Sequence, residues 1–374
     1  MESSTTAVQP LPFFQRLIKG RWIGKALLIA LACFIVVYIG KEAVRSPQLF
    51  VKQLINGLQL GFVYALIALG YTMVYGIVKL INFAHGDVFM FGAFVSYFAV
   101  SRFRLHTWMS DLIPQMPPAI SLFFGTLAVM LLSMVTCAVL AMAIERMAYK
   151  PLRNAPRISA LITAIGVSFF LEYFGALSFV FSPNYITYKR PFPVSTWYIY
   201  NGIHQLKSGV KAPSGSVLFS SILIIIILAS LSLVFLLQFV VHRTKIGKAM
   251  RAVAYDKPTA RLMGIPVDGV ISITFAIGAA LAGAAGVLYS TAYLQVVFGM
   301  GITPGLKAFV AAVLGGIGSI PGAFVGALIM GQAEVLSAGY ISTPMRDAIA
   351  FTILILVLLV RPTGIFGEPE LEKA

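Results

Sequence analysis

A few ionisable side chains interrupt long apolar stretches, and these are the residues that could do chemistry at membrane depth: His85, Asp87, Glu172, Glu334 and Asp347. Charge inside a bilayer is costly, so such side chains face the interior of a helix bundle and mark paths for ions or substrates. The alternative is that a residue stands at the end of a span and contacts water, which is the simpler interpretation of Asp347.

A polar segment at 81–87 (INFAHGD) lies between two strongly apolar stretches. Its Asn82, His85 and Asp87 supply hydrogen-bond donors and acceptors, and Gly86 could act as a hinge. Such a segment could form a gate or line a path. It could equally be a polar turn in which Asn82 or Asp87 caps the next helix. The residues alone leave both interpretations open.

The composition indicates that these residues belong to an integral membrane protein. Hydrophobic residues make up 59% of the 374-residue chain and charged residues only 11%, whereas soluble domains have about 25% charged residues. The apolar stretches are continuous and about 20 residues long, which favours helices over a β-barrel. The expected spans lie near 24–40, 54–78, 83–100, 119–144, 158–181, 217–241, 268–290 and 345–360.

The segment 303–338 differs from these spans because glycines and a proline interrupt it at 315–322 (GGIGSIPG). It is expected to form two half-length helices or one broken helix. Irregular backbone at membrane depth survives inside protein or beside water, so Gly315, Gly316 and Gly318 are candidate path residues. Close helix packing through small residues is the alternative. The predicted fold is an all-α integral membrane protein with about 8 full transmembrane helices plus a glycine-broken pair of short helices, about 8–10 segments in all.

Basic residues predict the orientation. They cluster before the first span, after the fourth and between the sixth and seventh, which places these loops and both termini in the cytoplasm if 303–338 returns to its starting side. The net charge of +15 therefore indicates membrane topology and not nucleic-acid binding. We expect a cytoplasmic extension at 1–23, a permease domain at 24–367 with an external aromatic loop at 182–216, and a cytoplasmic tail at 368–374.

The longest basic loop, 242–268, is predicted to carry a short amphipathic helix. Asp256 or Lys257 would begin it, Pro258 suits its first turn, and Gly264 would end it after Met263. Such a helix could present a small apolar face to a partner protein. A loop that rests on lipid headgroups is the alternative.

Nucleotide-binding and catalytic motifs are missing from the sequence. It contains no G-x-x-x-x-G-K-[ST] phosphate loop, no H-E-x-x-H, no G-x-S-x-G and no paired cysteine ligands. We therefore expect no enzyme activity and no metal site on this chain, and transport against a gradient would need energy from another chain or from an ion.

Several motifs in order resemble the first membrane subunit of bacterial branched-chain amino acid ABC importers. They are 56–70 (NGLQLGFVYALIALG), 81–87, 251–254 with 260–265, 274–283 (TFAIGAALAG), 315–323 and 361–367 (RPTGIFG). The resemblance covers about 50–367. It departs from the family at Asp87, where Glu is frequent, and in the length of the 1–50 and 182–216 segments.

The resemblance implies a permease in the bacterial inner membrane that works by alternating access. Its partners would be a second homologous permease, two cytoplasmic ATPase subunits that hold ATP and Mg, and an extracytoplasmic binding protein. The segment 256–264 matches the family's ATPase-coupling helix, with the candidate residues Arg251, Asp256, Lys257, Thr259, Ala260, Arg261, Met263 and Gly264. The candidate substrate path comprises Gln59, Tyr64, Asn82, His85, Gly86, Asp87, Gly315, Gly316 and Gly318. Importers of amides or urea share the signature, and an ion-coupled secondary transporter or a channel is the rival class.

Overall fold

The computed structural model describes residues 37–153, 155–207, 209–361 and 363–367. Most of the first expected span and both terminal segments, 1–23 and 368–374, lie outside these residues. The chain divides into two units, Met1–Phe50 and Val51–Ala374. In the first unit, residues 37–45 are helical. The site lies in the second unit.

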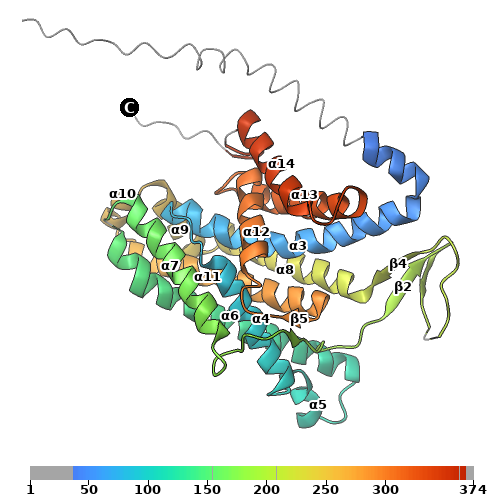
Figure 1. The fold of residues 1–374 in the computed structure, drawn as a ribbon. Helices are drawn as coiled ribbons and strands as arrows, with labels where there is room; N and C mark the ends of the chain where they lie inside the picture. Colours follow the sequence, from blue (N-terminus) through green and yellow to red (C-terminus); the bar gives the residue numbers. More distant parts are fainter. Residues whose placement is uncertain (1–36, 154, 208, 362, 368–374) are drawn as a thin grey trace, which may run out of the picture. The chain divides into compact units, whose positions relative to one another are not determined.

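Long apolar helices dominate the second unit (Figure 1). Among the described residues, six helices are long and apolar enough to cross a membrane, or seven if the 60° bend between Ser101 and Leu105 lies within one span. The prediction of an all-α membrane protein is confirmed. The long helices are α3 (Pro47–Val78), α4 (His85–Ser101), α6 (Pro118–Ile144), α7 (Arg157–Ala176), α8 (Ser221–Arg243), α11 (Val267–Tyr293) and α13 (Ile320–Tyr340).

Shorter elements connect these helices. The helical ones are η1 (Leu105–Thr107), α5 (Trp108–Leu112), η2 (Glu145–Tyr149), η3 (Lys150–Leu152), α9 (Lys245–Tyr255), α10 (Lys257–Leu262), α12 (Ile302–Gly315) and α14 (Arg346–Val360). The strands are β1 (Ile186–Thr187), β2 (Thr196–Ile199), β3 (Ile203–Gln205), β4 (Val217–Ser220) and β5 (Gln295–Val296). They form a β1–β5 pair and a three-stranded sheet in the order β3-β2-β4.

Burial separates central from peripheral helices. The most apolar window of α3 is 89% buried and that of α11 is 72% buried, whereas the windows of the α6 and α8 spans are 28% and 33% buried. α11 packs against α4 and α6 through small residues. A Cβ on Gly283 would lie 2.8 Å from the Ser133 carbonyl oxygen, and one on Gly286 would lie 2.5 Å from the Phe89 carbonyl oxygen. This close approach holds the bundle together where lipid offers no hydrophobic driving force.

The 303–338 segment is broken at its glycines, as the sequence predicts, but its two helices are unequal. α12 has 14 residues and ends at Gly315, and the φ of 106° at the following Gly316 is one that a side chain would disfavour. α13 has 21 residues and is long enough to cross a membrane by itself. The prediction that both helices are short is therefore wrong for α13, because the apolar sequence after Pro321 continues without another break.

The loop 182–216 contains three short strands, β1, β2 and β3, and a buried tyrosine. β2 lies between β3 and β4, with Trp197 opposite both Gln205 and Phe219. Tyr188 is only 2% exposed and packs in a cluster with Met90 and Phe94 of α4. The loop is thereby fastened to the end of the bundle where α4 and β5 meet.

Candidate functional site

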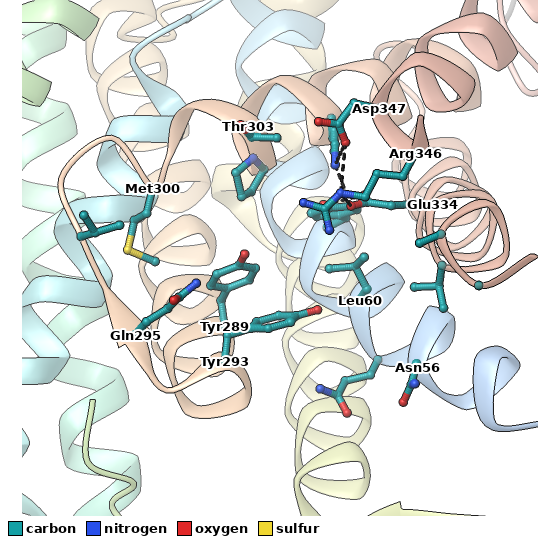
Figure 2. A pocket seen from close by; sticks show the side chains of 18 of the residues that line it. Asn56, Leu60, Tyr289, Tyr293, Gln295, Met300, Thr303, Glu334, Arg346 and Asp347 are labelled. Carbon is teal, nitrogen blue, oxygen red and sulfur yellow. Dashed lines mark hydrogen bonds and ion pairs between the residues drawn. The ribbon is translucent and has the colours of Figure 1, made fainter. Parts of the chain in front are cut away.

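A cavity of about 740 Å³ lies among α3, α11, α12, α13 and α14. This volume is within the range of small-molecule sites. Figure 2 shows side chains from these helices around it. The lining comprises Gln53, Asn56, Gln59, Leu60, Tyr64, Tyr185, Tyr289, Tyr293, Gln295, Val297, Gly299, Met300, Thr303, Pro304, Lys307, Glu334, Val335, Ala338, Gly339, Arg346 and Asp347. Of the predicted path residues, Gln59 and Tyr64 are in this lining.

Four charged residues form what we call the cavity cluster: Lys307, Glu334, Arg346 and Asp347. The Lys307 Nζ lies 2.6 Å from Glu334 Oε1 and 2.7 Å from Asp347 Oδ1. The Arg346 Nε lies 3.7 Å from Glu334 Oε1 and 3.4 Å from Asp347 Oδ1. The Tyr64 hydroxyl donates to Glu334 Oε2 at 2.9 Å. The cluster therefore extends from a buried ion pair to groups that are about half exposed.

Apolar and aromatic surfaces surround the charges. The Tyr289 and Tyr293 rings lie with their centroids 4.4 Å apart, and both side chains project into the cavity (Figure 2). Leu60, Met300 and Val335 also line it. The cavity is thus lined mainly by polar side chains, with a smaller apolar surface beside the four charges.

A second, smaller cavity of about 150 Å³ contains Gly86 and Asp87 from the predicted path. The Asp87 side chain is buried, and its Oδ2 accepts a hydrogen bond from the Ser168 hydroxyl. Its Oδ1 has no hydrogen-bond partner among the described residues. The first turn of α12 separates the two cavities, because Thr303 lines the larger one and Ile302 the smaller one.

The other predicted path residues line neither of these cavities. Asn82 accepts a hydrogen bond from the Tyr149 hydroxyl at 2.7 Å. His85 is buried with its ring 4.7 Å from that of Tyr71. Of the glycines of the helix break, Gly315 and Gly316 support close packing, whereas Gly318 has a φ of 101° and more space around it. A Cβ on Gly315 would lie 1.9 Å from the Gly322 carbonyl oxygen, and one on Gly316 would lie 2.4 Å from the backbone nitrogen of Gly367.

The short basic-loop helix is α10, and it begins and ends where the sequence predicts. The Asp256 carboxylate accepts from the backbone N–H of Thr259 and caps the helix. Gly264 follows it at a φ of 80°. The exposed apolar side chains here are Tyr255, Leu262 and Met263, at 82%, 87% and 78% exposure.

The predicted coupling residues divide into an outer and an inner set. Thr259, Arg261 and Met263 are exposed, whereas Ala260 is 4% exposed and packs inward. The Arg251 guanidinium donates to the Val241 carbonyl oxygen at the end of α8. The Lys257 ammonium donates to the carbonyl oxygen of Val78, the last residue of α3, at 3.1 Å. Partial burial, then the positive charges of Arg153 and Lys79, lower the pKa of Lys257.

A second group of charges, which we call the junction cluster, comprises Glu145, Lys150, Arg153 and Asp268. Arg153 pairs with both Glu145 and Asp268, and Lys150 lies 3.1 Å from Asp268. The Ser272 hydroxyl donates to the second oxygen of Glu145 at 2.6 Å. This cluster fastens η2 and η3 to the first turns of α11.

The cavity and α10 lie at opposite ends of the bundle. Tyr64 lines the cavity, and Val78, 14 residues later on α3, contacts Lys257, a rise of about 21 Å along a helix. α11 begins at Val267, just after α10, and its far end carries Tyr289 and Tyr293 into the cavity. Figure 1 shows α10 at the end of α11 away from β5.

Sequence reasoning missed Lys307 and Arg346. Lys307 lies inside the apolar stretch that begins α12, and it is 1% exposed. A lone lysine in such a stretch is as strong a signal as the acidic residues that were singled out. Arg346 precedes Asp347 at the start of a short apolar helix, a position at which a span end in contact with water would be expected.

Comparison with known proteins gives consistent results. Residues 53–358 match the family described as branched-chain amino acid transport system / permease component. The chain is 40% identical to the high-affinity branched-chain amino acid transport system permease protein LivH of Escherichia coli K12, over 87% of this chain and 97% of that protein. It is 40% identical to BraD of Pseudomonas aeruginosa, a protein with the same description, over 87% and 98%. A probable LivH of Methanocaldococcus jannaschii is 27% identical over 81% and 88%. No solved structure matches the chain.

Proposed function

The chain belongs to the branched-chain amino acid transport permease family, and from this premise we propose that it is the membrane-spanning subunit of an ATP-driven importer of branched-chain or other neutral amino acids. The observation that carries the proposal is the identity of about 40% to permeases of this description over 87% of the chain. The proposed partners are a second homologous permease, two cytoplasmic ATPase subunits with ATP and Mg, and an extracytoplasmic binding protein.

The exposed end of α10 is the proposed docking surface for an ATPase subunit. Tyr255, Leu262 and Met263 give this otherwise basic loop an apolar surface, and an apolar helix face suits a groove on a partner protein. The outward position of Met263 and Arg261 fits such contact, whereas Ala260 would act by packing α10 onto the bundle.

Lys257 supports the proposal that α10 transmits motion. Its ammonium bonds to the last carbonyl of α3, and the helix-terminal carbonyls of α3 have no partners within their own helix. A displacement of α10 would therefore pull on α3, whose other end lines the large cavity. This connection joins the proposed ATPase contact to the proposed substrate path through one helix.

The large cavity is the proposed outward-facing part of the path. Tyr185 is 76% exposed at its edge, so the cavity reaches the protein surface at the end opposite α10. If basic loops lie in the cytoplasm, this end faces outward, where a binding protein would release the substrate. We place Gln59 and Tyr64 on this part of the path.

Alternating access would then require α12 to move, because its first turn separates the cavities. Gly86 and Gly301 allow a backbone contact at this point, since a Cβ on Gly301 would lie 2.1 Å from the Gly86 carbonyl oxygen. Asp87, the segment around Asn82 and His85, and the 315–318 glycines would act in the inward-facing state. ATP can drive this change only by binding one state more tightly, by about 10⁴-fold to reverse a 1:99 population.

The test compares Leu262→Glu with Ile203→Glu, since both residues are exposed apolar side chains, on α10 and on β3. In cells that carry the partner subunits, a charge on the docking surface should abolish co-purification of the ATPase and lower ATP-dependent leucine uptake by at least about tenfold, a loss of about 1.4 kcal/mol. Ile203→Glu should leave both unchanged. Equal uptake by the two variants contradicts the coupling surface. Uptake that follows a proton or sodium gradient without any ATPase subunit would favour a secondary transporter.

A further inference from the structure

The cavity cluster has the charge pattern of a receptor for a zwitterion. Its members are two cations, Lys307 and Arg346, and two anions, Glu334 and Asp347, paired at 2.6–3.7 Å. The cluster is therefore neutral as a whole. A ligand that carries one positive and one negative group can exchange partners with it without leaving a net charge in the site. A simple anion or cation would leave one charge of the cluster uncompensated, which is costly beside the buried Lys307 and Glu334.

Its position on a cavity wall argues against a purely structural ion pair. Lys307 and Glu334 are 1% and 4% exposed, yet both line a cavity that could hold a small molecule. Charged groups at membrane depth are functional candidates because a structural role rarely offsets their cost. The side chains of Arg346 and Asp347, by contrast, are 47% and 44% exposed. They can therefore leave their present partners at little cost and meet a ligand.

The walls around the cluster set the size and polarity of the rest of the ligand. Leu60 and Met300 line the cavity beside the paired rings of Tyr289 and Tyr293. Figure 2 shows Glu334, Arg346 and Asp347 on one side and the two tyrosines on the other. An α-amino acid with an apolar side chain fits this division, because its ammonium and carboxylate share one carbon and its side chain points away from them.

We propose that the cavity cluster is a binding site for the charged groups of a zwitterionic amino acid, with Arg346 and Lys307 taking the carboxylate and Asp347 and Glu334 taking the ammonium. The proposal rests on the proposed function, because it names how the path recognises its substrate. In the empty site the four side chains neutralise one another. When the amino acid binds, the partly exposed Arg346 and Asp347 exchange one internal ion pair for two pairs to the ligand.

The test uses protection of a cysteine in the cavity wall. Thr303→Cys is placed in a background with Cys33→Ser and Cys137→Ser, in membranes that contain the assembled transporter. Thr303 is an exposed residue of the cavity lining. A water-soluble maleimide labels this cysteine, and gel separation isolates the chain from its partners. Ser214→Cys, on an exposed loop outside the cavity, is the matched control.

Leucine at millimolar concentration should slow labelling of Thr303→Cys and leave Ser214→Cys unaffected. Leucinamide lacks the carboxylate and 4-methylpentanoate lacks the ammonium, so each should protect at least about tenfold less well, as expected where a site's polar groups are left unpaired. Arg346→Gln should remove the preference for leucine over leucinamide. Asp347→Asn should remove the preference over 4-methylpentanoate. Unchanged labelling rates without ligand show that both variants are folded.

Three outcomes overturn the proposal: no protection by leucine, equal protection by all three compounds, or unchanged preferences in both variants. ATP-dependent uptake by membranes that carry the unsubstituted chain separates this failure from that of the proposed function. Uptake of leucine without selective protection refutes only the zwitterion site. Absence of uptake of leucine and of other neutral amino acids, under conditions in which the ATPase subunits co-purify, refutes the importer itself.

Discussion

The cavity cluster and the junction cluster have the same composition, two basic and two acidic side chains, but different surroundings. The cavity cluster lines an open space of about 740 Å³. The junction cluster lines neither cavity and joins η2 and η3 to α11. In the junction cluster both oxygens of the 1%-exposed Glu145 have partners, Arg153 and Ser272. Both clusters extend from a buried carboxylate to half-exposed groups, since Lys150 and Asp268 are 44% and 47% exposed. The open space beside the charges, and not their exposure, therefore distinguishes the cavity cluster, for which we propose recognition, from the junction cluster, which joins helices.

Substitutions in the two clusters should therefore have different effects. Removing one partner of a buried ion pair leaves the other charge buried without compensation. A pair beside a cavity can be compensated by water or by a neighbouring charge. The junction cluster should therefore matter most for folding, and the cavity cluster for transport.

The largest effect on stability is expected for Arg153→Met, which leaves the Glu145 carboxylate buried with only the Ser272 hydroxyl. The free energy of unfolding should fall by about 3–5 kcal/mol, as for other broken buried pairs. Cys137 is 0% exposed, so its reaction with a thiol-reactive dye during heating reports unfolding of the purified chain in a Cys33→Ser background. Arg153→Lys should recover part of the loss. An unchanged unfolding midpoint in Arg153→Met would remove the distinction between the clusters.

A smaller effect on stability but a large one on transport is expected for Lys307→Met. The Arg346 guanidinium already lies 3.7 Å from Glu334 and can replace the lost ammonium, and the cavity admits water. The loss of unfolding free energy should be less than half that of Arg153→Met, while leucine uptake should fall by about a hundredfold, which is about 2.7 kcal/mol. The same dye assay and uptake of labelled leucine measure the two quantities. Equal losses of unfolding free energy in both variants would show that the cavity cluster also stabilises the fold.

The sequence predicts local elements better than it predicts what they surround. The length of apolar stretches locates α3, α6 and α11, and capping chemistry locates α10 between Asp256 and Gly264, because these signals depend on neighbours along the chain. Local signals do not predict the cavity, because Tyr64, Lys307 and Glu334 come together only when α3, α12 and α13 pack. The sequence around Asn82 and His85 does not distinguish residues that line a path from residues that pack inside the bundle. In the structure they contact Tyr149 and Tyr71.

The smallest effect is expected at the edge of the junction cluster. The Arg261 side chain is 73% exposed and its guanidinium lies 4.0 Å from Asp268, a distance and exposure at which an ion pair contributes about 0–1 kcal/mol. Arg261→Gln should therefore leave the unfolding midpoint of the chain close to that of the wild type in the dye assay. Any loss of uptake in this variant would then report contact with the ATPase, because Arg261 lies on the exposed side of α10. A destabilisation as large as that of Arg153→Met would instead mean that the junction cluster extends to α10 and that enclosure alone does not set the strength of its pairs.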